Sequence, residues 1–324
     1  MITRRALGGL AALAPLPGLA QGSAFPNRPV KLVVPYTPGG SVDLMARAFG
    51  TRWSPHLGQP VITENRPGAS TMLATQFVAR SEPDGYTVLS GGTQLALMRH
   101  LGTPVPYDAE RDLTAVAVLT LIPYLLVVNA ALPVRTVPEL IAYMRARPGA
   151  MSYASFGVGG AGHLAAEMFN MMAGTQTLHV PYNGSPQAMT DTIAGRTDCM
   201  PVLLAAGRAQ IEAGRLRPLG ISNPARSDTL PGLPTIAEQG FPGFGMAGWY
   251  SLQLPAGTPE PIAAAIRRGM AAGLADEGTR RLMATNGLTP TAPADQGEAP
   301  LRARIAAELE QHRELLARAG VVPE

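Results

Sequence analysis

The sequence predicts an α/β protein of two lobes that are joined by two extended strands, with a ligand cleft between the lobes. Strand-type and helix-type patterns alternate along two separate stretches of the chain, and β-rich passages near 115–128 and 244–254 divide these stretches. The chain has 324 residues, of which 46% are hydrophobic and 15% charged. This length and composition are sufficient for two domains, each with its own core.

The first α/β series begins at residue 30. VKLVVPY (30–36) is a short apolar run that ends in a Pro-Gly-Gly turn, and apolar residues recur at helical spacing from Ser41 onward. The pattern continues with a strand at 61–64, a helix from about 71 to 80 and a strand at 86–90. Such alternation predicts a parallel sheet with helices on its faces.

A second series follows a β-rich run at 113–128 that Pro123 interrupts. The expected helices are 137–149, ending at Gly149, then 163–172 and 187–195, and the expected strands are 151–155, 178–182, 198–204 and 217–223. An extended run at 244–255 and helices at 259–274 and 297–320 close the chain. We therefore assign 25–121 and 246–324 to lobe 1, and 122–245 to lobe 2.

The N-terminus has the pattern of an export signal. Arg4 and Arg5 precede an apolar stretch at 6–13, and the small residues Gly18 and Ala20 stand before Gln21. We expect residues 1–20 to be a signal peptide cleaved near Ala20, which places the mature protein in the periplasm. Paired arginines leave the general and twin-arginine routes both open. After this segment no run reaches the roughly 18 apolar residues of a membrane span.

Charge, cysteine and histidine usage exclude several classes of function. The 26 basic residues, two of which are Arg4 and Arg5, balance 23 acidic ones and are scattered along the chain, so no nucleic-acid partner is expected. Cys199 is the single cysteine and stands in an apolar run, which predicts a buried structural thiol. Because the five histidines show no ligand spacing, no metal site is expected.

The loop SFGVGGAGHL (155–164) raises the alternative of a nucleotide site. Gly157, Gly159 and Gly162 match the G-x-G-x-x-G spacing. A dinucleotide fold also needs an acidic residue about 20 positions later, but the first carboxylate after Glu167 is Asp191, and no G-K-[ST] follows. No cofactor is required. A nucleotide-dependent, dehydrogenase-like enzyme that uses the loop from Gly157 to Gly162 remains the competing interpretation, since Ser155 lacks the elbow of a serine hydrolase.

A glycine-rich turn between a strand and a helix exposes backbone N–H groups at the positive end of the helix dipole, which favours an anion. The chain has two such turns, at 36–43 and 155–163, one in each expected lobe. Facing each other, they would hold a small acid from both sides.

Seven segments, in this order, carry a family resemblance: TPGGSVDLMAR, ENRPGAS, PDGYTVL, SFGVGGAGHLAAEMF, HVPYNGSPQAMTD, LPTIAEQGFPG and GWYSLQLPAGTP. The chain resembles the Bug family of periplasmic receptors of tripartite tricarboxylate transporters across essentially all of its mature length. The resemblance implies a monomeric "Venus flytrap" receptor without enzymatic activity. It would bind a small carboxylate and deliver it to membrane permease subunits, or act as a sensor subunit.

The same resemblance assigns the ligand contacts. In the first lobe they are Tyr36, Thr37, Gly39, Gly40 and Ser41, and we also expect Ser41 to be the N-cap of its helix. In the second lobe they are Ser155, Gly157, Gly159, Gly160, Ala161, Tyr182 and Asn183.

Asp43 and His163 lie beside these turns, and we expect both to be structural. Asp43 is expected to stabilise the first turn of its helix and to pair with Arg47 at i,i+4, in preference to contacting a ligand ammonium. The chain departs from the family pattern at 199–207, CMPVLLAAG. There Val202, Leu203 and Leu204 predict a more apolar side of the pocket and a less polar acid as ligand.

Overall fold

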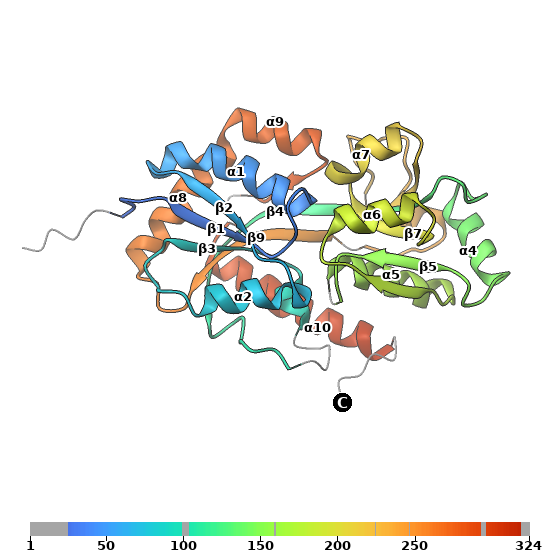
Figure 1. The fold of residues 1–324 in the computed structure, drawn as a ribbon, viewed down its shortest axis with the longest axis horizontal. Coiled ribbons are helices and arrows are strands. Elements are labelled where there is room, and N and C mark those ends of the chain that lie inside the picture. Colours follow the sequence, from blue (N-terminus) through green and yellow to red (C-terminus); the bar gives the residue numbers. More distant parts are fainter. Residues whose placement is uncertain are drawn as a thin grey trace, which may run out of the picture.

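The computed structural model describes residues 25–98, 104–158, 160–223, 225–245, 247–292 and 296–318. The predicted signal peptide, 1–20, lies outside these residues. Two α/β halves lie side by side along the longest axis of the molecule (Figure 1). The predicted two-lobe α/β architecture is therefore confirmed.

Both halves are built on one continuous sheet in the order β2-β1-β3-β9-β4-β7-β5-β6, with β8 and β10 paired to β4. The strands are β1 (Val30–Val34), β2 (Val61–Asn65), β3 (Thr87–Gly92), β4 (Leu113–Asn129), β5 (Ser152–Ser155), β6 (Leu178–Pro181), β7 (Cys199–Leu203), β8 (Leu216–Ile221), β9 (Ala247–Pro255) and β10 (Thr289–Pro290). β2, β1 and β3 are parallel, and so are β6, β5 and β7. Each half thus contains the parallel unit that the alternating pattern predicts.

Strand β4 runs through both halves. Residues 113–123 pair with β9, and from Tyr124 onward β4 pairs with β7 on one side and, from Leu125, with β8 on the other. The prediction that Pro123 interrupts this run is wrong, because β4 is one strand of 17 residues. Pro123 occupies the point where the partner changes from β9 to β7, so its missing N–H removes little from either ladder.

The chain passes between the halves a second time just before β9. Phe244 packs in the core of the second half, whereas Trp249 packs in the first. All pairs of β9 are with β3 and with 113–123 of β4.

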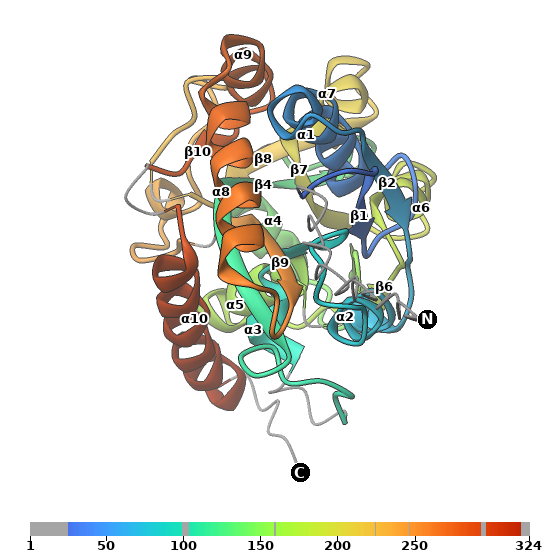
Figure 2. The ribbon, with the colours of Figure 1, turned by 90° about the vertical axis from the view of Figure 1, so that its left-hand side faces the viewer.

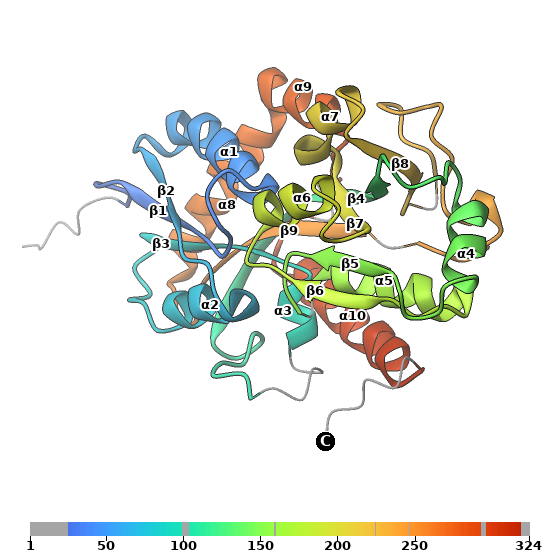
Figure 3. The same ribbon diagram turned by 45° about the vertical axis from the view of Figure 1, so that its right-hand side comes forward.

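Helices cover both faces of the sheet in each half. In the first half they are η1 (Ala69–Thr71), α1 (Ser41–Leu57), α2 (Met72–Ala79), α3 (Gln94–Leu97), α8 (Glu260–Ala275), α9 (Glu277–Thr285) and α10 (Glu298–Arg318). In the second they are α4 (Val137–Arg145), α5 (Ala161–Ala173), α6 (Ser185–Ile193), α7 (Leu204–Glu212) and η3 (Ala237–Gln239). Figure 2 shows α1, α8 and α9 separated from α2, α3 and α10 by the sheet, and Figure 3 shows α6 and α7 on the face opposite α5.

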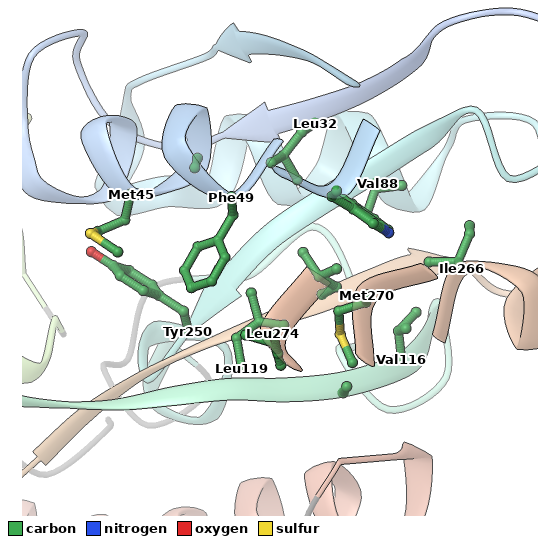
Figure 4. Packing of buried hydrophobic residues seen from close by; sticks show 14 of the residues in the cluster. Leu32, Met45, Phe49, Val88, Val116, Leu119, Tyr250, Ile266, Met270 and Leu274 are labelled. Carbon is green, nitrogen blue, oxygen red and sulfur yellow. The ribbon is translucent and has the colours of Figure 1, made fainter. Parts of the chain in front are cut away.

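The cores follow the alternation of strand side chains. Leu32 packs toward α1 and α8 with Phe49, Ile266 and Met270 (Figure 4), while its neighbour Val33 packs on the opposite face. The second half has one core under α4 and α5 and another under α6 and α7. Strands buried on both faces explain the nearly continuous apolar runs of the sequence.

Several details differ from the sequence-based expectations, among them α3 and β10, which were not expected. The helix expected to end at Gly149 ends at Arg145, and Gly149 has a φ of 71° in the turn that follows. Helices α7 and α9 were not expected, because each follows the preceding element with no separating run of turn residues. None of the helices in the described part of the chain is both long and apolar enough to cross a membrane.

Candidate functional site

A buried cavity lies between the two halves, and both contribute to its walls. The first half provides Tyr36, Gly40, Val42, Gly91, Gly92, Thr93, Gln94, Trp249 and Tyr250, with Ile122 and Tyr124 from β4. The second half provides Phe156, Gly160, Gly162, Ser185 and Leu203. The cavity is at the carboxyl ends of the parallel strands of both halves, where open α/β sheets bind their ligands.

Besides α3 and α7, whose N-caps Thr93 and Leu203 line the cavity, three helices begin there: α1, α5 and α6. Their N-caps are the glycines Gly40, Gly160 and Gly184, and in the described part of the chain no side chain caps any of them. Side-chain caps are present on α4, where Thr136 accepts a hydrogen bond from Glu139 N, and on α9, which Asp276 caps in the same way, whereas α2, α3, α7 and α8 also have none. Glycine N-caps thus place the positive ends of three helix dipoles at the cavity, and such helix ends favour an anion.

Two buried hydroxyl groups in the wall of the cavity have no hydrogen-bond partner among the described residues. They are Oγ1 of Thr93, which is 4% exposed, and the phenol oxygen of Tyr250, which is 6% exposed. A buried hydroxyl without a partner costs about 1–3 kcal/mol, so a polar ligand that bonds to both would recover that cost. Neither residue was predicted from the sequence; Thr93 directly follows Gly92, the last residue of β3, and Tyr250 lies two residues after Gly248 in β9.

The cavity carries no ionisable carboxylate, lysine, arginine or histidine side chain among its described lining residues. Its ionisable groups are the phenols of Tyr36, Tyr124 and Tyr250. Burial is the main cause that raises their pKa values; the phenol of Tyr107 adds to the shift of Tyr36, and Tyr36 adds to the shifts of Tyr124 and Tyr250. These phenols are neutral hydrogen-bond donors at pH 7. Positive potential in the cavity therefore comes from backbone dipoles.

Asp43 lies directly behind the first turn of α1 and is confirmed as structural. Its carboxylate accepts hydrogen bonds from Gly39 N at 2.9 Å, from Arg47 Nε at 3.0 Å and from Asn65 Nδ2 at 2.8 Å. Burial alone would raise the pKa of Asp43, but these hydrogen bonds outweigh it and the pKa is lowered. The Asp43 carboxylate fixes the turn that precedes α1. Its hydrogen bonds are made to other residues of the protein.

His163, the third residue of α5, is buried and is also structural. Its ring stacks on His179 with 4.2 Å between centroids, and His179 stacks on Tyr153 at 4.7 Å. Burial lowers the pKa of His163 to about 4 and, with the second imidazole nearby, that of His179 to about 3, so both rings are neutral at pH 7.

Ser155 connects this stack to the glycine-rich turn. His179 Nε2 lies 2.6 Å from Ser155 Oγ, which in turn accepts a hydrogen bond from Gly157 N at 3.2 Å. Ser155 is fully buried, and its hydroxyl group stabilises the glycine-rich turn through the hydrogen bond from Gly157 N.

The predicted contact residues occupy three kinds of position. Tyr36, Gly40 and Gly160 line the cavity. Thr37 and Gly157 lie where the halves meet: Thr37 packs against Gly184, and Gly157 against Ser70. Gly39 has a φ of 78° and donates to Asp43.

Ser41 and Ala161 are the first residues of α1 and α5. The expectation that Ser41 is the N-cap is wrong, because Gly40 holds that position in extended conformation. Asn183 is exposed in the turn before α6, and the Tyr182 hydroxyl donates to Asp191 Oδ2 at 2.8 Å, outside the cavity lining. Gly159 lies outside the described residues. Which of these groups contact ligand stays a prediction.

The apolar segment at 202–204 is placed differently from the prediction. Only Leu203 lines the cavity, while Val202 and Leu204 are buried in the core under α6 and α7. Alternation along β7 explains why Val202 and Leu203 face opposite sides, and Leu204 is already the first residue of α7. Cys199 is buried as predicted, and burial raises the pKa of its thiol to about 12. Among the described residues, no group of three or more His, Cys, Asp or Glu side chains could hold a metal ion.

Two α/β halves that share crossing strands and enclose a cavity at their glycine-capped helix ends define a two-lobe periplasmic binding protein. The chain belongs to the tripartite tricarboxylate transporter receptor family, whose pattern matches residues 45–320. The predicted Bug-family resemblance is thereby confirmed.

Individual relatives agree with this assignment. BugT of Bordetella pertussis is 34% identical over 290 residues, covering 88% of each chain. The solved periplasmic binding protein BugD superposes with a TM-score of 0.88 at 30% identity, over 92% of this chain and 99% of that one. An R. palustris protein solved with adipate gives a TM-score of 0.89 at 34% identity, over 93% and 100% of the two chains. These relatives are binding proteins and not enzymes, so the dehydrogenase-like alternative is set aside.

Proposed function

We propose that this chain is an extracytoplasmic solute receptor that binds a small organic carboxylate between its lobes and passes it to a membrane transporter. Lobe 1 comprises 25–121 and 246–324, and lobe 2 comprises 122–245. The carboxylate is held by first-turn N–H groups of the glycine-capped helices, with neutral hydroxyl groups around it.

The observation that carries this proposal is the convergence of three helix starts without side-chain caps on one cavity. Gly40, Gly160 and Gly184 supply the caps, and the unpartnered hydroxyls of Thr93 and Tyr250 line the same space. The positive ends of three helix dipoles, together with two hydroxyl groups that lack a partner among the described residues, suit an anion. The R. palustris neighbour that holds adipate supports a carboxylate as the anion.

The test compares acids with their neutral amides. Purified mature protein is titrated with C4 to C8 mono- and dicarboxylates and with the matching amides, and the unfolding temperature is followed. A ligand that binds only the native state raises that temperature, so at least one acid is expected to stabilise the protein while its amide does not. Equal stabilisation by acid and amide, or by no acid, contradicts the proposal. Native mass spectrometry of freshly purified protein supplies an independent search for a retained acid.

Export is part of the same proposal. Cleavage near Ala20 yields a periplasmic chain that begins at or close to Gln21. N-terminal sequencing of the periplasmic fraction tests this directly, and a cytosolic protein that retains Met1 would contradict it. We further expect a monomer, which light scattering of the purified protein measures.

A further inference from the structure

A negative charge lies at the start of α1, where the proposed site needs positive potential. Asp43 is the third residue of α1, and its 3% exposed side chain accepts a hydrogen bond from Gly39 N at 2.9 Å. The next residue, Gly40, is the N-cap of α1 and lines the cavity. Because the pKa of Asp43 is lowered despite burial, the side chain is a carboxylate at pH 7. Such a charge offsets the positive end of the helix dipole that a bound anion would use.

Arg47 supplies a balancing charge one helical turn further along α1. Its Nε donates to Asp43 Oδ2 at 3.0 Å, and its Nη2 lies 3.0 Å from Asp43 Oδ1, so the guanidinium group contacts both carboxylate oxygens. The Arg47 side chain is 49% exposed and does not line the cavity. Arg47 therefore reaches a ligand in the cavity through its effect on Asp43.

Asn65, the last residue of β2, connects this ion pair to the turn before α1. Its Nδ2 donates to Asp43 Oδ1 at 2.8 Å and to the carbonyl oxygen of Tyr36 at 3.0 Å. Its Oδ1 accepts a hydrogen bond from Arg47 Nη2 at 2.8 Å. Since Tyr36 lines the cavity, this network holds the two opposite charges in a fixed place directly behind the ligand turn.

Resting on the proposed function, we propose that Arg47 is a positioning residue of the anion site, because it neutralises the buried charge of Asp43 and leaves the positive potential at the start of α1 to the ligand. Without the guanidinium group, hydrogen bonds from Gly39 N and Asn65 would still favour the ionised form of Asp43. The uncompensated carboxylate would then repel the bound anion, and such repulsion is strong where solvent screening is weak.

Two substitutions at position 47 separate the charge of the arginine from its hydrogen bonds. Arg47→Gln removes the charge and keeps an N–H donor, whereas Arg47→Lys keeps the charge and loses the planar fork of donors. The ligand is the C4 to C8 mono- or dicarboxylate that most raises the unfolding temperature of the wild type. In calorimetric titration its affinity is expected to fall about tenfold in Arg47→Gln and to stay within about threefold of the wild type in Arg47→Lys.

A double variant and a control complete the experiment. Asp43→Asn combined with Arg47→Gln removes both charges, so its affinity is expected to return to within about threefold of the wild type. A network that only supports the turn predicts the reverse, a double variant at least as weak as Arg47→Gln. The control is Arg52→Gln on the same helix, since Arg52 lies 3.9 Å from Asp276 and does not line the cavity. It changes the net charge equally and is expected to bind like the wild type.

The outcomes distinguish this inference from the proposed function. If Arg47→Gln binds as tightly as Arg52→Gln, if Arg47→Lys is as weak as Arg47→Gln, or if the double variant is not rescued, the role of Arg47 is overturned while the carboxylate receptor stands. If no acid of the series binds the wild type, the proposed function fails and this inference fails with it. The unfolding temperature of each variant verifies that it is folded.

Discussion

Gly184 and Thr37 meet across the two halves so closely that a methyl group on Gly184 would lie 2.2 Å from Thr37 Oγ1. Thr37 belongs to the turn before α1, and Gly184 is the N-cap of α6. The two glycine-capped turns that we assign to the ligand are therefore also the surfaces on which the halves close. Nearby, Gly157 of the second half packs on Ser70 of the first.

Gly184→Ala is expected to weaken ligand binding without unfolding the protein. The added methyl group forces Thr37 away and opposes closure by about 1–3 kcal/mol, the usual cost of overpacking, which corresponds to roughly five- to hundredfold in affinity. Gly232→Ala is the control, because a Cβ at Gly232 meets nothing within 4 Å. Calorimetry with the acid identified for the wild type measures both variants. Wild-type affinity in Gly184→Ala would show that the turns do not touch in the bound state.

A second contact between the halves involves Arg208, in the middle of α7. Arg208 Nη2 donates to the carbonyl oxygen of Thr285, the last residue of α9, at 2.6 Å. A cation at a helix C-terminus is stabilising. Arg208→Ala is expected to weaken ligand binding by about 1 kcal/mol, or roughly fivefold, because this hydrogen bond exists only when the halves are together. Scattering of the ligand-free variant should show a larger particle than the wild type.

Arg268→Ala is the matched control for that measurement, since Arg268 is an exposed arginine on α8. The two variants lose the same charge, so a difference between them isolates the contact with Thr285. If both behave alike, Arg208 contributes only net charge.

Local sequence signals were sufficient for the parallel units but not for the way the halves meet. Val30–Val34 followed by a glycine turn and Ser41 predicts strand, turn and helix, because each step depends on neighbouring residues. Nothing local predicts that Pro123 stands where β4 changes partners, since that position is defined by strands β7 and β9, more than 70 residues away.

The candidate site also has a part that the sequence predicts and a part that it does not. Its backbone part was predictable, because glycine-rich turns at helix starts are visible in the sequence. Thr93 and Tyr250 were not, because their significance is that tertiary packing buries their hydroxyls without a partner. The apolar segment at 202–204 was predicted to face the pocket as a whole, but the pleat of β7 turns only Leu203 toward the cavity.

The turn before α2 holds strain that a glycine would relieve. Ala69, Ser70 and Thr71 have positive φ values of 45°, 49° and 81°, which are unfavourable for residues with a Cβ. Ala69 is exposed, so Ala69→Gly is expected to stabilise the fold by about 1 kcal/mol in urea unfolding. Ala48→Gly within α1 is expected to destabilise by roughly 0.5–1 kcal/mol. Destabilisation in both variants would mean that the backbone at Ala69 is not strained.

Glu308 gives the last prediction, on the pH dependence of stability. Its Oε1 accepts a hydrogen bond from the indole N–H of Trp249 at 2.6 Å, and its Oε2 is buried without a partner among the described residues. Burial raises the pKa of Glu308 from 4.5 to about 7, although Trp249 and Arg304 partly oppose the shift. Trp249 lines the cavity, so this carboxyl group lies directly behind the ligand wall.

The sign of the effect follows from proton binding. Because the folded chain holds this proton more tightly than the unfolded chain, Glu308 contributes stability that is complete below about pH 4.5 and is lost as the pH rises toward 7. The loss is about 3 kcal/mol for a shift of this size. His163 and His179 act in the opposite direction: their lowered pKa values give stability that is complete above 6.5 and lost as the pH falls. The two trends partly cancel in the wild type.

The Glu308→Gln variant separates the pH dependence caused by Glu308 from that caused by the two histidines, because glutamine keeps a hydrogen-bond acceptor for Trp249 and cannot ionise. Urea unfolding at pH 5 and pH 8 is expected to show that the variant gains about 2–3 kcal/mol relative to the wild type between these two pH values. Glu298→Gln, at a solvent-accessible glutamate of the same helix, is the control and should show little change. If the difference between Glu308→Gln and the wild type is the same at both pH values, Glu308 is ionised throughout this range. Its negative charge would then face the wall of an anion site, and ligand affinity should rise in the glutamine variant.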